Sequence, residues 1–130
     1  MREHSRRELT RKLEKRHVPE VVAQALDELA ARGLQSDGRF AEQYVHSRRN
    51  KGYGPVRIRG ELAERGVADE LISRELEAFG NEEWRSLMLQ VVRHRFGDQP
   101  AEDRREMARR GRFLASRGFP SWMINEYLFG

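Results

Sequence analysis

The chain has 130 residues, of which 38% are hydrophobic and 35% are charged, and its formal net charge is +4. This length allows one compact domain or a short array of small units. The absence of cysteine excludes disulfides and thiolate sites. No apolar run approaches the roughly 18 residues needed to cross a bilayer, and the N-terminus carries no signal-like segment. We therefore expect a cytoplasmic protein without membrane contact, and its basic charge favours a polyanion or an acidic protein surface as partner.

A short motif occurs three times along the chain. The stretches LEKRHVPEVV, LAERGVADELI and LASRGFPSWMI begin at Leu13, Leu62 and Leu114, with spacings of 49 and 52 residues. In each copy, apolar residues recur every three or four positions on both sides of a turn, which is typical of two amphipathic helices. Gly66 and Gly118 stand at the turn, where a left-handed residue commonly ends a helix. The sequence therefore predicts three copies of one helical unit.

The predicted helices follow the chain in three groups. They are 5–16 and 19–32 in the first unit, 37–49, 55–65 and 67–79 in the second, and 81–96, 104–117 and 119–128 in the third. Asp37 and Asn81 are the expected N-caps of the leading helices. The fold class is therefore all-α, with tandem three-helix repeats at 37–80 and 81–130 and an incomplete first repeat at 1–36 that lacks its leading helix. Because units of this size cannot bury their own apolar faces, we expect them to cover one another in an elongated array.

Charge divides the helices on the two sides of each turn. The helices after the first two turns are mainly acidic, which disfavours their use as DNA recognition helices. The helices before the turns are basic and carry Arg6, Arg7 and Arg11 in the first copy, Arg57 and Arg59 in the second, and Arg105, Arg109 and Arg112 in the third. If the units stack in phase, these side chains form a discontinuous basic stripe suited to a phosphate backbone or an acidic groove. The alternative is a set of solvated helix faces with pairs at i,i+4 spacing, such as Arg57 with Glu61.

The stretch NKGYGPVRIRG at 50–60 joins the first two helices of the second unit. Its glycines allow unusual backbone angles, and Pro55 suits the first turn of a helix. Free amides at this helix N-terminus could bind an anion beside Arg48, Arg49 and Lys51, or the stretch could be a tight corner between helices. Tyr53 could stack on a base, fill a pocket in a partner or pack across the corner.

Nothing in the sequence indicates catalysis. His4, His17, His46 and His94 are scattered, without metal-ligand spacing and without cysteine. The carboxylates alternate with arginine instead of meeting in an apolar pocket. We therefore expect a non-enzymatic protein with no cofactor and no metal, acting as a monomer.

The central stretch GLQSDGRFAEQYVHSRRNKGYGPVRIRGELAERGV, at 33–67, strongly resembles the signature of the RecX family, bacterial regulators of the RecA recombinase. The resemblance rests on an initial Gly-Leu, then R-F-A, an aromatic-Val pair, G-x-G-P, R-I, E-L and R-G-V. It continues in weaker form over nearly the whole chain. One departure is LQSD, which is less acidic than the usual Leu-Leu-Asp-Asp, and another is the missing leading helix of the first repeat.

The resemblance implies a non-enzymatic, all-α protein of tandem three-helix repeats. It further implies binding to RecA and its nucleoprotein filament, with inhibition of filament growth, ATPase and strand exchange in homologous recombination, DNA repair and the SOS response. We expect the array to lie in the filament groove and to contact RecA or DNA through basic residues and one tyrosine: Arg6, Arg7, Arg11, Arg39, Arg48, Arg49, Lys51, Tyr53, Arg57, Arg59, Arg105, Arg109 and Arg112.

Two other functions stay open. One is a free-standing, sequence-independent protein that binds single-stranded or double-stranded DNA through the basic helix faces, with affinity that falls steeply as salt rises. The other is an interaction scaffold that docks another protein through Trp122, Tyr127 and Phe129 and ignores DNA.

Overall fold

Helices make up all the regular structure of the residues that this computed structural model describes, which are 3–15, 17–31 and 36–130. The helices are α1 (Arg6–Leu13), α2 (Pro19–Ala31), α3 (Asp37–Asn50), α4 (Pro55–Glu64), α5 (Asp69–Glu77), α6 (Asn81–Phe96), α7 (Arg104–Arg117) and α8 (Ser121–Phe129). The predicted all-α class is therefore confirmed. Gly33 and Leu34 of the quoted signature lie outside the described residues.

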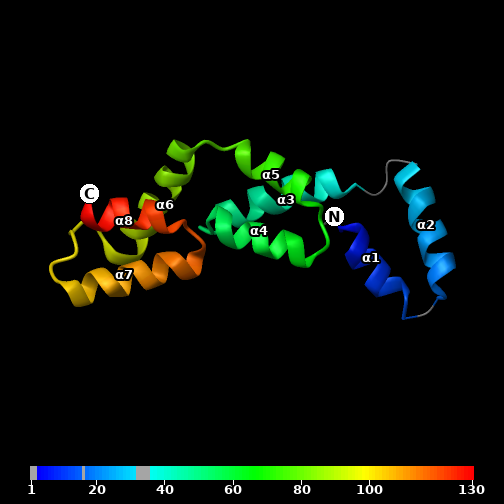
Figure 1. Cartoon of the computed structure of the whole chain (residues 1–130), viewed down its shortest axis with the longest axis horizontal. Coiled ribbons are helices and arrows are strands. Elements are labelled where there is room, and N and C mark those ends of the chain that lie inside the picture. Colours follow the sequence, from blue (N-terminus) through cyan, green and yellow to red (C-terminus); the bar gives the residue numbers. More distant parts are fainter. Residues whose placement is uncertain (1–2, 16, 32–35) are drawn as a thin grey trace.

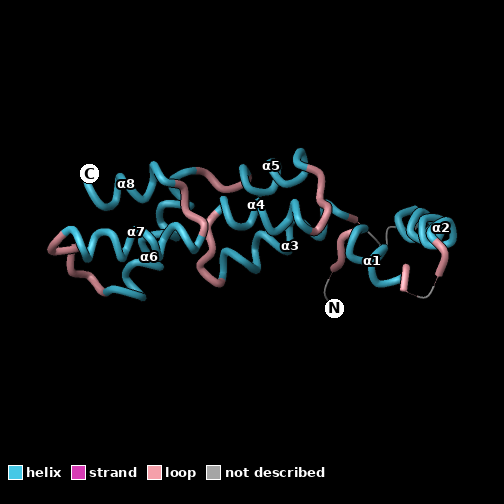
Figure 2. Tube along the Cα trace, turned by 60° about the horizontal axis from the view of Figure 1, so that its bottom comes forward, coloured by secondary structure: helices cyan, strands magenta, loops and turns pink. Residues whose placement is uncertain are grey.

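The helices follow one another along the long axis of an elongated molecule (Figure 1). α1 and α2 lie at one end, α3 to α5 in the middle and α6 to α8 at the other end, and Figure 2 shows the same order from another side. α3 and α4 pack on α5, α7 packs on α8, and α1 packs on α2. The predicted elongated array is confirmed, and we call the three groups repeats one, two and three.

Both predicted caps of the leading helices are wrong by one residue. The N-cap of α3 is Ser36, whose hydroxyl accepts a 3.1 Å hydrogen bond from the Arg39 amide, and the N-cap of α6 is Gly80. Asp37 is instead the first residue of α3, and its carboxylate accepts a 2.8 Å hydrogen bond from the amide of Arg6. The side chain expected to cap its own helix therefore ties repeat one to repeat two.

The buried core is continuous across repeats two and three. Apolar side chains from α3, α4, α5, α6, α7 and α8, such as Phe40, Leu62 and Met123, form one cluster. Val22 and Leu26 of α2 are also buried, but they lie outside that cluster. α1 contributes no buried residue of its own. Repeat one is therefore held to the rest of the described structure by polar contacts more than by a shared core.

The same kind of junction joins each repeat to the next. At the first junction, the buried hydroxyl of Ser5, the N-cap of α1, donates a 2.7 Å hydrogen bond to the carbonyl oxygen of Arg65 in the α4–α5 turn. At the second junction, the N-terminus of α4 lies on the α7–α8 turn at Gly118. Gly66 and Gly118 have φ of 85° and 96°, as the left-handed turn prediction requires. The side chains of Arg7 and Arg57 lie over these two glycines, so any side chain there would collide with the neighbouring repeat.

Candidate functional site

The stretch 50–60 forms the corner at the second junction. The amide of Gly54 donates to the carbonyl oxygen of Arg117 at 2.8 Å, and the amide of Val56 donates to that of Gly118 at 2.9 Å. Pro55 is the first residue of α4, as expected, and has no amide hydrogen. The prediction of free amides that bind an anion is therefore wrong for these positions, because the next repeat already satisfies them.

Glu61 pairs with two of the arginines expected at the interface. Arg48 donates to both carboxylate oxygens at 2.9 Å, and Arg57 donates to one of them at 3.1 Å, which confirms the predicted i,i+4 pair. The hydroxyl of Tyr44 donates to the same carboxylate at 2.9 Å. Burial raises the pKa of Glu61, but the hydrogen bonds from Tyr44, Arg57 and Arg48 outweigh it and hold the pKa below its ordinary value. Burial, followed by the bond to Glu61, raises the pKa of Tyr44.

Tyr53 packs across the corner between the two repeats. The guanidinium carbons of Arg48, Arg57 and Arg117 lie 3.8, 4.4 and 4.9 Å from the centre of its ring. These distances are those of cation–π contacts, which hold the ring in place. Of the alternatives for this side chain, the structure shows the packing role.

Four of the other predicted interface arginines also pair with carboxylates within the chain. Arg59 pairs with Asp69 at 2.8 Å, Arg6 with Asp27 at 2.8 Å, Arg39 with Glu3 at 3.4 Å and Arg109 with Glu106 at 3.0 Å. Hydrogen bonds from Arg109 and then Arg110 lower the pKa of Glu106 to about 2. Among the described residues, Arg11, Arg105 and Arg112 are exposed and form no ion pair. The role of these three side chains in a basic binding stripe stays a prediction.

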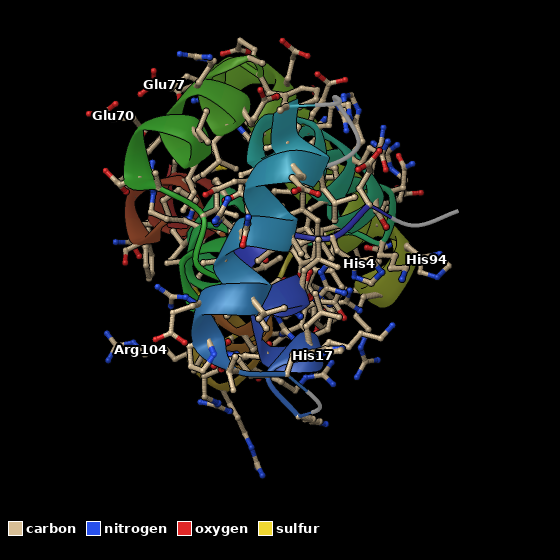
Figure 3. All side chains as sticks on the ribbon, turned by 90° about the vertical axis from the view of Figure 1, so that its right-hand side faces the viewer. His4, His17, Glu70, Glu77, His94 and Arg104 are labelled. Atoms are coloured by element: carbon tan, nitrogen blue, oxygen red, sulfur yellow. The ribbon has the colours of Figure 1, made fainter. Side chains whose placement is uncertain are left out.

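The structure brings a different set of basic side chains together in a cleft of about 490 Å³ beside the corner, between α3, α6 and α7. Five basic side chains line it: Arg49, Lys51, His94, Arg95 and Arg117. The other lining residues are neutral, and no carboxylate is among them. We call this hollow the basic cleft. In the view along the molecule, His94 projects from one side, whereas Glu70 and Glu77 of the acidic α5 project elsewhere (Figure 3).

Aromatic rings and carbonyl oxygens, not carboxylates, position the arginines of the basic cleft. The guanidinium carbon of Arg49, in the last turn of α3, lies 4.0 Å from the ring centre of Phe79, and burial lowers its pKa. The guanidinium carbon of Arg95 lies 5.5 Å from the ring centre of Phe113. Arg117 donates to the carbonyl oxygen of Lys51 at 3.0 Å. Glu83, which is not part of the cleft lining, attracts Arg49 and partly offsets the effect of burial on its pKa. Because the lining itself contains no carboxylate, the cleft keeps a net positive charge that suits an anionic surface.

Sequence reasoning found Arg49 and Lys51 but missed the other three members of the cleft. His94 and Arg95 belong to the run RHR near the end of α6. Basic residues are common there because the helix dipole favours positive charge at its C-terminus, so the run by itself does not indicate a binding site. Arg117 is the arginine that precedes the turn glycine, Gly118, of the third motif copy. Only the packing of α6 against α7 places these side chains beside the end of α3.

Neither metal nor membrane features are seen in the part of the chain that the structure describes. No group of three or more histidine, aspartate or glutamate side chains in that part could hold a metal ion. No helix of the same residues is long and apolar enough to cross a bilayer.

Comparison with known proteins identifies the family of this chain. The family model described as the second three-helix domain of RecX matches residues 36–76, and that of the third three-helix domain matches residues 82–128. A regulatory protein RecX of Chromohalobacter salexigens is 50% identical over 119 residues, which are 91% of this chain and 77% of the relative. The chain belongs to the RecX family. A second RecX, from Pseudomonas syringae pv. tomato, is 44% identical over 130 residues, which cover 99% of this chain and 83% of the relative.

Solved structures show that the fold is also that of RecX. The crystal structure of RecX from Lactobacillus salivarius matches with a TM-score of 0.81 at 19% identity, covering 98% of this chain and 84% of that one. Another crystal structure of a regulatory protein RecX gives a TM-score of 0.81 at 25% identity, covering 98% and 64%. The fold and the family implied by the resemblance are therefore confirmed. The α1–α2 pair precedes both matched ranges.

Proposed function

We propose that this RecX-family chain binds the RecA recombinase and its nucleoprotein filament without catalysing a reaction. Bound there, it inhibits filament growth, ATPase and strand exchange. The observation that carries the proposal is the basic cleft, where five basic side chains meet with no carboxylate among them. Family membership supports RecA as the partner.

The shape of the molecule supports contact with several subunits at once. Three helical repeats lie in line, and repeats two and three share one core (Figure 1). An elongated molecule of this kind can cross a boundary between neighbouring subunits in a helical groove. Its basic cleft would then face DNA phosphate or acidic protein surface, and the bound chain would oppose subunit addition or the domain movements of turnover.

Sequence-independent DNA binding is the second candidate, and the same cleft favours it. Phosphates attract unpaired lysine and arginine side chains, and neutralising them releases counterions. Lys51 and Arg95 are exposed and have no acidic partner among the described residues. The two functions differ in whether RecA is needed for the effect.

The deciding experiment measures the DNA-dependent ATPase rate of RecA filaments assembled before this chain is added. We expect the rate to fall when the chain is present at well below one copy per RecA subunit. The Lys51→Glu/Arg95→Glu variant should lose this inhibition. The matched control is Lys15→Glu/Arg74→Glu, which changes net charge equally at exposed positions outside the cleft. An unchanged ATPase rate, together with salt-sensitive binding to naked DNA, would favour the second candidate.

A further inference from the structure

A second hollow, of about 690 Å³, lies between α7 and α8 at the end of the molecule farthest from repeat one. Its floor is apolar and includes Met107, Gly111, Ile124 and Leu128. Phe129 lies at its edge with 72% of its surface exposed. We call it the α7–α8 groove. In Figure 3, Arg104 of this groove projects on the side opposite to His94 of the basic cleft, so the two surfaces are distinct.

The corresponding position in repeat two is largely closed. Aligning Leu62 with Leu114 places Arg59 of α4 at the position of Gly111 in α7. Arg59 reaches across to α5, where it donates to Asp69 at 2.8 Å and to Ser73 at 3.2 Å. The hollow that remains there measures about 280 Å³, against about 690 Å³ in repeat three.

Repeat three lacks every part of that bridge. The position of Arg59 is held by Gly111, and the positions of Asp69 and Ser73 are held by Ser121 and Asn125. A Cβ atom at Gly111 would lie only 3.3 Å from Leu128 Cδ1, so α7 and α8 approach closely and expose an uninterrupted apolar floor. An exposed apolar surface of this kind usually marks a site of interaction.

The charges at the edge of the groove indicate what binds there. Arg104 and Arg112 line it, and no carboxylate is among the lining residues. Both arginines are exposed, and neither forms an ion pair within the described residues. An apolar floor between cationic edges complements a helix with one apolar face and acidic flanks.

We propose that the α7–α8 groove binds an acidic amphipathic helix of another protein. The helix lays its apolar side chains along the floor and against Phe129, and its carboxylates face Arg104 and Arg112. This proposal does not depend on the role given to the basic cleft, because it uses other residues on another side of the molecule.

A second copy of this chain fits the groove less well. Two copies that met symmetrically through this surface would bring Arg104 and Arg112 of both copies together, and like charges would oppose the contact. The two acidic helices of a second copy have already used their apolar faces: α5 buries Ile72 and Leu76, and α2 buries Val22 and Leu26. Val21 of α2 is exposed, but one side chain is too small to fill the floor of the groove. The favoured occupant is therefore a helix from a different protein.

The test uses two fluorescent model peptides of about 18 residues, long enough for a helix of about 27 Å. Both carry leucine at helical spacing on one face. The remaining positions are mostly glutamate in the acidic peptide and mostly lysine in the basic peptide. Fluorescence anisotropy with the full chain should show the acidic peptide binding about tenfold more tightly or better, because two edge contacts change from attraction to repulsion.

Two variants and one control distinguish binding in the groove from nonspecific binding of the peptides elsewhere on the surface. Arg104→Glu/Arg112→Glu should reverse the preference, so that the basic peptide binds more tightly than the acidic one. Phe129→Ala should weaken both peptides several-fold, whereas Leu89→Ala, which removes another exposed apolar side chain on α6, should weaken neither. These side chains are at the surface, and an unchanged melting temperature shows that each variant is folded.

A third variant rebuilds the bridge of repeat two. Gly111→Arg/Ser121→Asp should close the groove and abolish binding of the acidic peptide. The proposal is overturned if neither peptide binds at millimolar concentration, or if Arg104→Glu/Arg112→Glu leaves the preference unchanged. Sedimentation that shows self-association broken by Phe129→Ala would also overturn it, because a second copy would then occupy the groove.

Discussion

The amide of Gly54 donates a 2.8 Å hydrogen bond to the carbonyl oxygen of Arg117, 63 positions later in the chain, so the corner of repeat two is built on the turn of repeat three. A Cβ atom at Gly54 would lie 2.5 Å from the carbonyl oxygen of Gly118. The backbones meet too closely there for any side chain, which explains why glycine precedes Pro55.

Gly54→Ala should therefore destabilise the protein by about 1–3 kcal/mol, because the two repeats must move apart to admit the methyl group. Gly60→Ala is the matched control, since a Cβ atom there meets nothing within 4 Å. Inside α4 it should stabilise the protein by about 0.5–1 kcal/mol through better helix propensity. Urea unfolding followed by circular dichroism measures both, and equal effects of the same sign would contradict the junction described.

Replacing Glu61 should release two arginines and a tyrosine at once. We expect Glu61→Gln to lower the free energy of unfolding by about 1–3 kcal/mol at neutral pH, because Arg48 loses a charged partner. Glu64→Gln on the same helix is exposed and should stay within about 0.5 kcal/mol of the original chain.

The Glu61 effect should also depend on pH. Because the folded pKa of Glu61 is lower than the ordinary 4.5, its contribution is fully present above pH 4.5 and is lost as pH falls through the folded pKa. The difference in melting temperature between Glu61→Gln and the original chain should therefore shrink between pH 5 and acidic pH. A difference that stays constant with pH would mean that the carboxylate charge is not what stabilises this network.

Repeat one should be the least stable part of the described structure. α1 buries no residue of its own, and Ser5 both caps it and donates to the Arg65 carbonyl oxygen. Ser5→Ala should cost about 1–2 kcal/mol, seen as faster hydrogen exchange in α1 while α4 and α7 keep their protection. Ser47→Ala, at an exposed position of α3, serves as the control. Equal loss of protection in all helices would show that repeat one is part of the global unfolding unit.

The basic cleft can be tested on DNA without RecA. The slope of log K against log salt should become less steep by about 0.9 for each duplex phosphate contact that Lys51→Glu/Arg95→Glu removes. Lys15→Glu/Arg74→Glu should leave the slope near that of the original chain. A replacement that included Arg48 would be a poor probe, since it would break the Glu61 network and change the fold as well as the charge.

The sequence by itself determined the helices and their repetition. The spacing of apolar residues in each motif copy, the left-handed glycines at Gly66 and Gly118, and the proline that begins α4 all act within a few positions of one another. Such signals depend on local backbone geometry, so they can be recognised in the sequence without knowing which helices pack against each other. Local signals did not place the caps of the leading helices, since the Asp37 carboxylate accepts from the Arg6 amide of repeat one and Ser36 caps α3 instead.

Tertiary structure alone decided which charges remain available. Thirteen positions separate Arg48 from Glu61, and 66 separate Arg117 from Lys51, so neither contact follows from a helical period. The sequence around an arginine does not show whether a carboxylate or an aromatic ring will lie beside its side chain in the fold. The basic cleft is formed from the ends of α3 and α6 and one face of α7, and it keeps a net positive charge because no carboxylate is among its lining residues.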